Sequence, residues 1–258
     1  MWHHAPLTPL GVCSSVAPRR PEVNVIFRVF FLGLAVTLTG GIGDAAAQAP
    51  AQPPIEGNIY SVTYIEVMPT TRADAVALLK RYREATRKED GNLRTEVASR
   101  IGQGHQLVIL EVWKDQKAFE AHRNSANTRQ IRERIQAIRN APTDERVHVG
   151  VSVGPLHATV GSDAVYVVTH VDVIPPRKED GLAAVKQLGE DGRAGVGNVR
   201  FEVVQQTNRP NHFTVVEVWR DAKAVEAHSM ADATRQFRDK LGPMSGALYD
   251  ERMFKTVD

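Results

Sequence analysis

Cysteine is nearly absent from this chain of 258 residues, since the single one, Cys13, lies close to the N-terminus. The rest of the chain therefore cannot form a disulfide, use a thiol nucleophile or build a cysteine-ligated metal site. The sequence also lacks a block of basic residues with interleaved aromatics, and its net charge is only +2. Neither nucleic acid nor an acidic membrane surface is an expected partner.

Long hydrophobic runs are scarce. The apolar run from Val29 to Ile42 follows Arg28, and it is shorter than the ~20 residues that a membrane-spanning helix needs. A positive flank, a short apolar core and the small-residue exit Ala45-x-Ala47 are typical of a secretory signal peptide. We expect cleavage after Ala47, export to the periplasm or the medium, and a mature form that is not embedded in a membrane. An uncleaved membrane anchor is the alternative.

Familiar catalytic signatures are missing as well. The chain contains no G-x-S-x-G and no Walker A sequence. The glycines of Gly192-x-x-Gly195-x-Gly197 follow a predicted helix and precede a strand, which is the reverse of a dinucleotide-binding loop. His122 has no histidine, cysteine or carboxylate at zinc-binding spacing on its own helix, so we expect no metal site.

The chain does contain a long internal repeat. The segment EVWKDQKAFEAH, from Glu111 to His122, returns as EVWRDAKAVEAH, from Glu217 to His228, at an offset of 106 residues (217 − 111 = 106). This period is far longer than the ~20–50 residues of solenoid repeats, so it indicates a duplicated domain. We assign a signal peptide (1–47), a disordered linker (48–59), a first domain (60–153), a second linker (154–165) and a second domain (166–258).

Each copy is predicted to follow the order β-α-β-β-α-β. Thr71-x-x-Asp74 is typical of a capping box at the start of the first helix. The second helical stretch is predicted to break near Asn124. In the first copy we expect strands at Tyr60–Val67, Asn92–Ile101, His105–Trp113 and about Asp144–Val151, and the second helical stretch at Gln116 to about Ile138.

This order is the ferredoxin-like unit, an α+β fold that covers one sheet face with helices and leaves the other face in need of a partner. A tandem copy can supply that partner. We therefore expect the two sheets to meet in one pseudo-dimeric α/β barrel within the chain, with the helices outside. Further oligomerisation of the whole chain stays open.

The order of elements, the E-V-W strand end and the helix that follows it (Lys117–His122 and Lys223–His228) resemble the antibiotic biosynthesis monooxygenase domain. The resemblance covers about Tyr60–Val151 and Tyr166–Met253, and it implies a dimeric α/β barrel. Some members of this family oxidise quinols or polycyclic phenols with O2 and without a metal or flavin, while others degrade haem. The asparagine that haem-degrading members carry on the first strand is missing from both copies, which disfavours haem.

The resemblance implies a chemistry that needs no cofactor. A deprotonated phenol or hydroquinone can pass an electron to O2, so the protein must supply a base, a dry pocket and orientation. We expect His122 and His228 to be the catalytic bases, because imidazole titrates near neutral pH. The partners would be a small aromatic or quinol-like molecule and O2. The expected substrate contacts are Trp113 and Trp219, Glu111 and Glu217, Tyr64 and His170, Phe119, and Tyr82.

Structural roles are open for the same residues. The histidines could bond to backbone carbonyls, the tryptophans could pack in the core, and Glu111 and Glu217 could pair with Arg94 and Arg200 on the neighbouring strand. The protein would then be a non-catalytic barrel that binds a small ligand, takes part in a stress response or serves a structural role. The sequence does not say which copy holds a working site.

Overall fold

A computed structural model describes residues 56–257 of the chain. The predicted signal peptide and most of the predicted linker at 48–59 lie outside these residues. Within 56–257, none of the helices combines the length and apolar character needed to cross a bilayer.

The first repeat has the predicted order of elements. Its helical stretch breaks at Asn124 as predicted, and the side chain of Ser125 then caps the next helix by accepting a hydrogen bond from the Thr128 amide. The elements are β1 (Ile59–Glu66), α1 (Arg72–Thr86), β2 (Asn92–Arg100), β3 (Gln103–Trp113), α2 (Gln116–Arg123), α3 (Ala126–Ile138) and β4 (Asp144–Ser152).

The second repeat repeats this order element by element. Its bounds are β5 (Val165–Asp172), α4 (Lys178–Arg193), β6 (Asn198–Gln206), β7 (His212–Trp219), α5 (Ala222–Ser229), α6 (Asp232–Leu241) and β8 (Asp250–Thr256). Short 3-10 turns precede α1 and α4 at Pro69–Thr71 and Pro175–Arg177, and a third turn follows α6 at Gly242–Met244.

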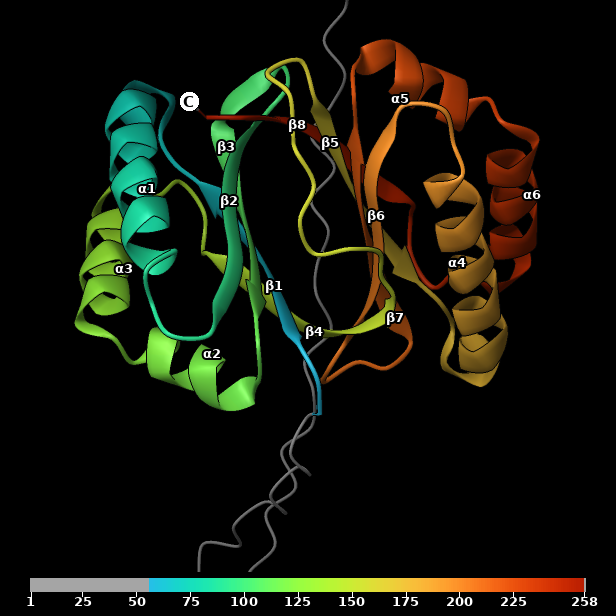
Figure 1. Cartoon of the computed structure of the whole chain (residues 1–258), viewed down its shortest axis with the longest axis horizontal. Helices are drawn as coiled ribbons and strands as arrows, with labels where there is room; N and C mark the ends of the chain where they lie inside the picture. Colours follow the sequence, from blue (N-terminus) through green and yellow to red (C-terminus); the bar gives the residue numbers. More distant parts are fainter. Residues whose placement is uncertain (1–55, 258) are drawn as a thin grey trace, which may run out of the picture. The chain divides into compact units, whose positions relative to one another are not determined.

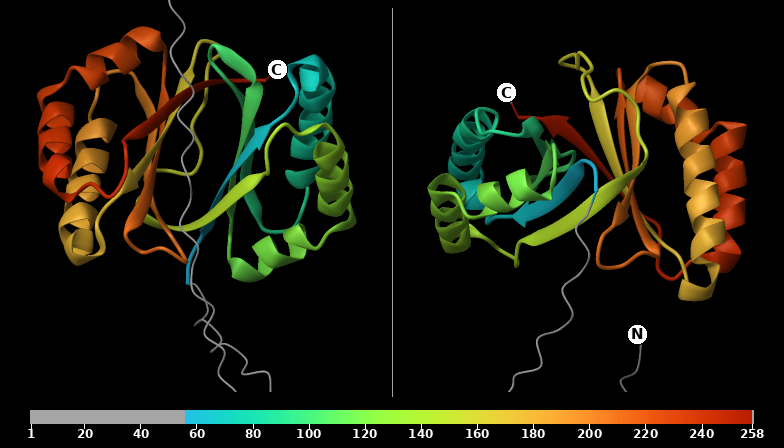
Figure 2. Two further views of the ribbon diagram at one scale, coloured as in Figure 1. Left: turned by 180° about the vertical axis from the view of Figure 1, so that it is seen from behind. Right: turned by 60° about the horizontal axis from the view of Figure 1, so that its bottom comes forward.

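The eight strands close into one barrel in the order β1-β3-β2-β8-β5-β7-β6-β4. Closure depends on the last strand of each repeat. β4 pairs with β1 of its own repeat and with β6 of the other, while β8 pairs with β5 and β2. Helices α1–α3 cover one side of the barrel and α4–α6 cover the opposite side (Figures 1 and 2). The predicted pseudo-dimeric α/β barrel is therefore confirmed.

Strand alternation divides the side chains between two environments. On β3, Leu107 and Ile109 pack with α1 and α3, whereas Val108 and Leu110 pack in the barrel interior with residues of β5 and β7. Both faces of β3 are buried, as its continuous apolar sequence predicts. Sites on the two faces of one strand are consequently separated by the sheet itself.

The predicted capping box at the start of α1 is wrong. The Thr71 hydroxyl donates to the Met68 carbonyl at 3.0 Å, and within the described residues its side chain accepts no capping hydrogen bond. The physical reason is the 3-10 turn at Pro69–Thr71, which leads the chain directly into the helix.

Gly91 fixes the approach of α2 to the sheet. It has a φ of +80°, and its carbonyl accepts a hydrogen bond from the Lys114 amide at 2.9 Å. A Cβ atom at this position would lie 2.6 Å from the Cβ of Ala118 in α2. Only glycine meets both requirements, and the second repeat has Gly197 at the equivalent position with a φ of +84°.

Candidate active site

A pocket of about 280 Å³ lies in the first repeat and is lined by residues of its sheet and of helices α1 and α3. Its inner end is formed by Tyr82 of α1 and Glu111 of β3, which are both buried. Its mouth is formed by exposed side chains of α3 and of the segment that follows it, including Gln136 and Thr143. The walls are mainly apolar, with Ile65, Ile109, Ile131 and Ile135, and they also include Thr63 and Thr128. This is a small, half-enclosed cavity with polar groups at its two ends.

A chain of hydrogen bonds lies at the inner end. The Tyr82 hydroxyl is 2.8 Å from Glu111 Oε1 and 2.8 Å from His122 Nε2, and His122 Nδ1 is 2.8 Å from Glu89 Oε2. His122 is only 3 % exposed. It does not line the pocket itself, because Tyr82 and Glu111 stand between it and the cavity. The predicted base is thus connected to the cavity through two other side chains.

The geometry of this network constrains its protons. Tyr82 has one hydroxyl hydrogen, so it donates either to Glu111 or to His122. If it donates to Glu111, His122 must donate from both nitrogens and is an imidazolium. If it donates to His122, Glu111 must be protonated to bond to the Tyr82 oxygen. The two arrangements contain the same number of protons, and shifting hydrogens through the Tyr82 hydroxyl interconverts them.

Electrostatics at the inner end favour proton sharing. Burial raises the pKa of the Glu111 carboxyl, while His122 and the Tyr82 hydroxyl act in the opposite direction. Burial and the neighbouring Glu111 carboxylate raise the pKa of Tyr82 well above its ordinary value. Tyr82 therefore stays neutral and can pass a hydrogen between its neighbours without ionising.

Trp113 holds the imidazole in place. Its ring stacks on His122 with the centroids 4.4 Å apart and the planes inclined by 28°. Trp113 is fully buried and does not line the pocket, and its indole nitrogen has no hydrogen-bond partner among the described residues. The expectation of an aromatic wall is therefore wrong for Trp113, because its strand ends beneath α2, where the ring is covered by the helix. Phe119 of α2 packs in the same core cluster with Ile59 and Ala118.

The second repeat contains the same stack without the network. His228 lies on Trp219 with the centroids 4.5 Å apart and an angle of 28° between the planes. The positions equivalent to Tyr82 and Glu89, 106 residues further on, are Leu188 and Gly195. Glu217 accepts a hydrogen bond from the Trp219 indole at 2.7 Å, and burial raises its pKa to about 8. Burial lowers the pKa of His228 to about 4, so this imidazole is neutral at neutral pH.

Bulkier side chains occupy the second repeat where the first has its pocket. Phe237 stands at the position equivalent to Ile131 and is buried in the core of its repeat. Tyr249 stands at the position equivalent to Thr143, with Arg238 5.5 Å above its ring. Burial, Glu251 and Glu217 raise the pKa of Tyr249 to about 12.

Tyr64 and His170 do not lie between the sheet and the helices of either repeat. They point into the barrel interior, where the Tyr64 hydroxyl is 2.8 Å from His170 Nε2. His170 Nδ1 lies 3.0 Å from the Thr214 hydroxyl, which is 2.9 Å from His148 Nε2. Burial is the main cause that lowers the pKa of His170 to about 3 and that of His148 to about 4. Their strand positions have the opposite parity from Glu111, so the sheet separates them from the pocket.

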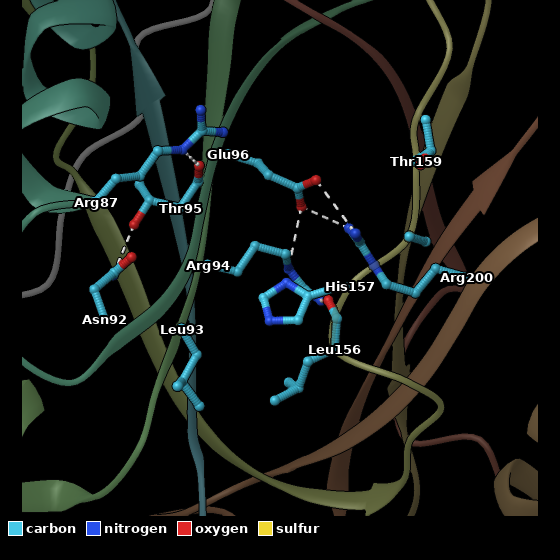
Figure 3. Close-up of a pocket in the computed structure, with 11 residues that line it drawn as sticks. Arg87, Asn92, Leu93, Arg94, Thr95, Glu96, Leu156, His157, Thr159 and Arg200 are labelled. Carbon is cyan, nitrogen blue, oxygen red and sulfur yellow. Dashed lines mark hydrogen bonds and ion pairs between the residues drawn. The ribbon is translucent and has the colours of Figure 1, made fainter.

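The alternative in which Glu111 and Glu217 pair with Arg94 and Arg200 is not what the structure shows. Arg94 and Arg200 point into the barrel and pair with Glu202 and Glu96 across the two repeats, each at 2.6 Å. Figure 3 shows Glu96 between the two arginines, beneath the connection that carries Leu156 and His157. Although burial alone would raise it, Arg200 and Arg94 hold the pKa of Glu96 below its usual value. All four ions are paired, although Arg94 Nε and Arg200 Nε make no hydrogen bond with the described residues, so this cluster joins the repeats.

Sequence reasoning missed Glu89 and the apolar wall residue Ile131. The signal that could have found them is the comparison of the two repeats, since both positions change, to Gly195 and Phe237. Within residues 56–257, no group of three or more histidine, cysteine or carboxylate side chains is arranged to hold a metal ion.

Comparisons with known proteins agree with this architecture. The model of the family described as "Antibiotic biosynthesis monooxygenase" matches residues 58–134 and 164–240. The "Putative monooxygenase YcnE" of Bacillus subtilis (strain 168) is 27% identical over 81 residues, which are 31% of this chain and 85% of that protein.

Two crystal structures share the barrel across most of the chain. A "putative monooxygenase" from Fusobacterium nucleatum has a TM-score of 0.70 at 16% identity and covers 78% of this chain and 93% of its own. One from Lactobacillus acidophilus has a TM-score of 0.65 at 15% identity and covers 79% and 95%. The chain belongs to the antibiotic biosynthesis monooxygenase family and contains two copies of its domain.

Proposed function

We propose that the pocket of the first repeat oxidises a small phenol or quinol with O2, and that this chemistry needs neither a metal nor a flavin. The observation that carries the proposal is the chain Glu89–His122–Tyr82–Glu111 at the inner end of an apolar cavity. Membership of a family named for monooxygenases supports the reaction class.

The cavity suits a flat molecule of one or two rings. Its volume of about 280 Å³ lies just below the ~300–1,000 Å³ of pockets that take drug-sized ligands. Isoleucine side chains form the walls, so the rings of the substrate would displace water from an apolar surface. A substrate hydroxyl can then reach Glu111, the only carboxylate at the inner end among the residues that line this cavity.

Proton removal follows from the geometry. The base form of the network has one proton fewer than the two arrangements described above. Glu111 is ionised, His122 is neutral, and the Tyr82 hydroxyl donates to only one of them. Glu111 accepts the hydroxyl proton of the substrate, and the Tyr82 hydroxyl passes a proton on to His122 Nε2. The Glu89 carboxylate, 2.8 Å from Nδ1, then stabilises the imidazolium. Glu111 is thus the residue that contacts substrate, and His122 acts through it.

The oxidation balances with O2 alone. The phenolate passes one electron to O2, and the resulting radical and superoxide combine to form a C–O bond at a ring carbon that bears hydrogen. Loss of water from this hydroperoxide leaves a quinone, so a phenol and O2 give a quinone and H2O. One oxygen atom enters the product, and the other leaves as water with two hydrogens of the substrate. The apolar walls limit the escape of the charged intermediates.

The test is O2 uptake by residues 48–258 with 1-naphthol and with hydroquinones, after removal of metals by chelation. We expect uptake that His122→Ala and Glu111→Gln reduce by about 10²–10⁴-fold. The matched variants His228→Ala and Glu217→Gln change the equivalent residues of the second repeat and should retain activity. Equal losses in both sets, with the proteins shown to be folded, would refute the assignment to the first repeat.

A non-catalytic, ligand-binding barrel is the second candidate. It is favoured by the stacking of His228 on Trp219, which matches that of His122 on Trp113 although the network is missing. The stack therefore does not require catalysis. Tight binding of a phenol without O2 uptake or product formation would support this candidate.

We also propose that the protein is exported and cleaved after Ala47. The apolar run Val29–Ile42 and the Ala45-x-Ala47 exit support this, and the first strand begins only at Ile59, so cleavage would leave the barrel intact. Expression of the whole chain in a bacterial host followed by mass spectrometry should find Gln48 as the N-terminus in the periplasmic fraction. An intact N-terminus in the cytosol would contradict export.

A further inference from the structure

The pocket contains a positive charge without a partner. Arg139 lines the cavity and is half-buried, and its guanidinium makes no hydrogen bond or ion pair with any of the residues 56–257. Buried or half-buried arginines are normally paired, because removing the charge from water is costly. A free guanidinium on a residue that lines the cavity is available to pair with an anion from outside the chain.

The neighbouring charges do not satisfy this group. Glu145, the other carboxylate that lines the pocket besides Glu111, is paired with Arg123 at 2.9 Å and with Arg132 at 3.4 Å. The mouth of the cavity thus has an excess of positive charge. Glu111 is held at the inner end by Tyr82.

The backbone holds Arg139 at this place. It directly follows α3, where its amide donates to the Ile135 carbonyl at 2.9 Å. The residue also forms an isolated β-bridge with Val67, just beyond the end of β1. The guanidinium is therefore presented from a fixed point between the helix and the sheet, which lowers the entropic cost of binding an anion there. The equivalent residue of the second repeat is Ser245, which has no charge.

We infer that the substrate of this pocket is an aromatic hydroxy acid, whose carboxylate pairs with Arg139 while its phenolic hydroxyl faces Glu111. The planar fork of a guanidinium matches a carboxylate with two parallel hydrogen bonds. The apolar walls between the two polar ends then contact the ring. This inference rests on the proposed function only for the position of the hydroxyl, since the anion site is defined by Arg139 itself.

The experiment compares two ligands that differ by one carboxylate. Binding of 2,5-dihydroxybenzoate and of hydroquinone is measured by calorimetry without O2, so that no turnover occurs. We expect the wild-type protein to bind the carboxylate about 10- to 100-fold more tightly, as for a charge-assisted hydrogen-bonded pair. Arg139→Gln should remove this preference and leave hydroquinone binding unchanged, and Arg139→Lys should retain part of it.

Arg134→Gln is the matched control, because Arg134 is exposed on α3, the helix that precedes Arg139, and does not line the pocket. It makes the same change in net charge and should bind both ligands like the wild type. The inference fails if the wild type shows no preference, binds neither ligand, or keeps its preference in Arg139→Gln.

The two proposals fail separately. An Arg139-dependent preference without any O2 uptake would support the anion site and refute the oxygenase. O2 uptake with neutral hydroquinones and no preference for the carboxylate would support the oxygenase and refute the anion site.

Discussion

At the scale of single residues, Tyr82 distinguishes the two repeats. Both repeats have the tryptophan–histidine stack and a buried glutamate, but only the first has a hydroxyl that joins them. In the second, the position belongs to Leu188, and Glu217 turns to the Trp219 indole instead. The carboxylate and the imidazole are 3.6 Å apart in both repeats, but only in the first does a hydroxyl bond to both of them.

Tyr82→Phe removes that oxygen and keeps the ring. We expect the rate of substrate oxidation to fall by about 10²–10⁴-fold, because Glu111 and His122 lose their connection. The free energy of unfolding should change by only about 1–3 kcal/mol, the usual cost of a lost buried hydrogen bond. Steady-state kinetics and urea unfolding measure the two quantities. An unchanged rate would show that proton transfer does not pass through Tyr82.

Buried histidines and Glu217 set the pH dependence of stability. His228 and His148 have folded pKa values of about 4, below their ordinary 6.5, so the unfolded chain binds more protons there and stability rises with pH up to about 6.5. The folded pKa of Glu217 is about 8, above its ordinary 4.5. The folded chain then binds the extra proton, and stability falls as pH rises towards 8.

We therefore predict that the urea midpoint is highest near pH 6.5. In the wild type the free energy of unfolding should fall between pH 6.5 and 8. Glu217→Gln should reduce this fall by more than about 1 kcal/mol, because the amide keeps the hydrogen bond from Trp219 but does not titrate. Between about pH 4.5 and 6.5 the rise in stability should become steeper, because the opposing contribution of Glu217 is removed. If the variant falls as steeply as the wild type above pH 6.5, Glu217 is not the group responsible.

At the scale of elements, periodicity and the repeat predicted all eight strands and the break between α2 and α3. The errors concern side-chain neighbours. Arg94 was placed beside Glu111 because the two strands are adjacent, but the register pairs Glu111 with Thr95, and Arg94 points into the barrel. Register and the 3-10 turn before α1 depend on tertiary packing, which a local pattern does not contain.

The site was predictable only in part. His122, Glu111 and Tyr82 were identified because they follow a recurring motif or differ between the repeats. Glu89 lies in a loop without a pattern, and only the fold brings its carboxylate to His122. Tyr64 and His170 were expected to contact the substrate, but they meet in the barrel interior, on the other side of the sheet from the pocket.

The close packing of α2 against Gly91 can be tested by comparing alanine substitutions at two glycines. Gly91 and Gly102 both have a positive φ, +80° and +78°, but only Gly91 has neighbours within 4 Å of a Cβ atom. Gly102→Ala should cost about 1–2 kcal/mol from backbone strain alone. Gly91→Ala should cost about 1–3 kcal/mol more, because the methyl group overlaps Ala118. Chemical denaturation measures both, and equal losses would contradict the close packing of α2.

At the scale of the whole molecule, each repeat completes the other. The last strand of each half lies between its own first strand and the second strand of the other half. The ion cluster of Arg94, Glu96, Arg200 and Glu202 reinforces this connection from inside the barrel. Neither half closes a barrel without a partner.

We predict that residues 56–153 expressed alone form a symmetric dimer. Two copies would restore the strand pairings, and Arg94 of one copy would meet Glu96 of the other in place of Glu202. Light scattering coupled to size-exclusion chromatography should show twice the mass of the fragment, with dissociation and unfolding coupled on dilution. A folded monomer at micromolar concentration would contradict this dependence.

The contact between Tyr64 and His170 has a consequence for how such a protein can change. The two residues are equivalents, 106 positions apart, that meet across the pseudo-twofold axis. In a dimer of identical chains every substitution appears twice, so a tyrosine can face only a tyrosine there. When the two copies are joined in one chain, equivalent positions can contain different residues. The two halves accordingly differ at the pocket, where the first has Ile131 and Thr143 and the second has Phe237 and Tyr249.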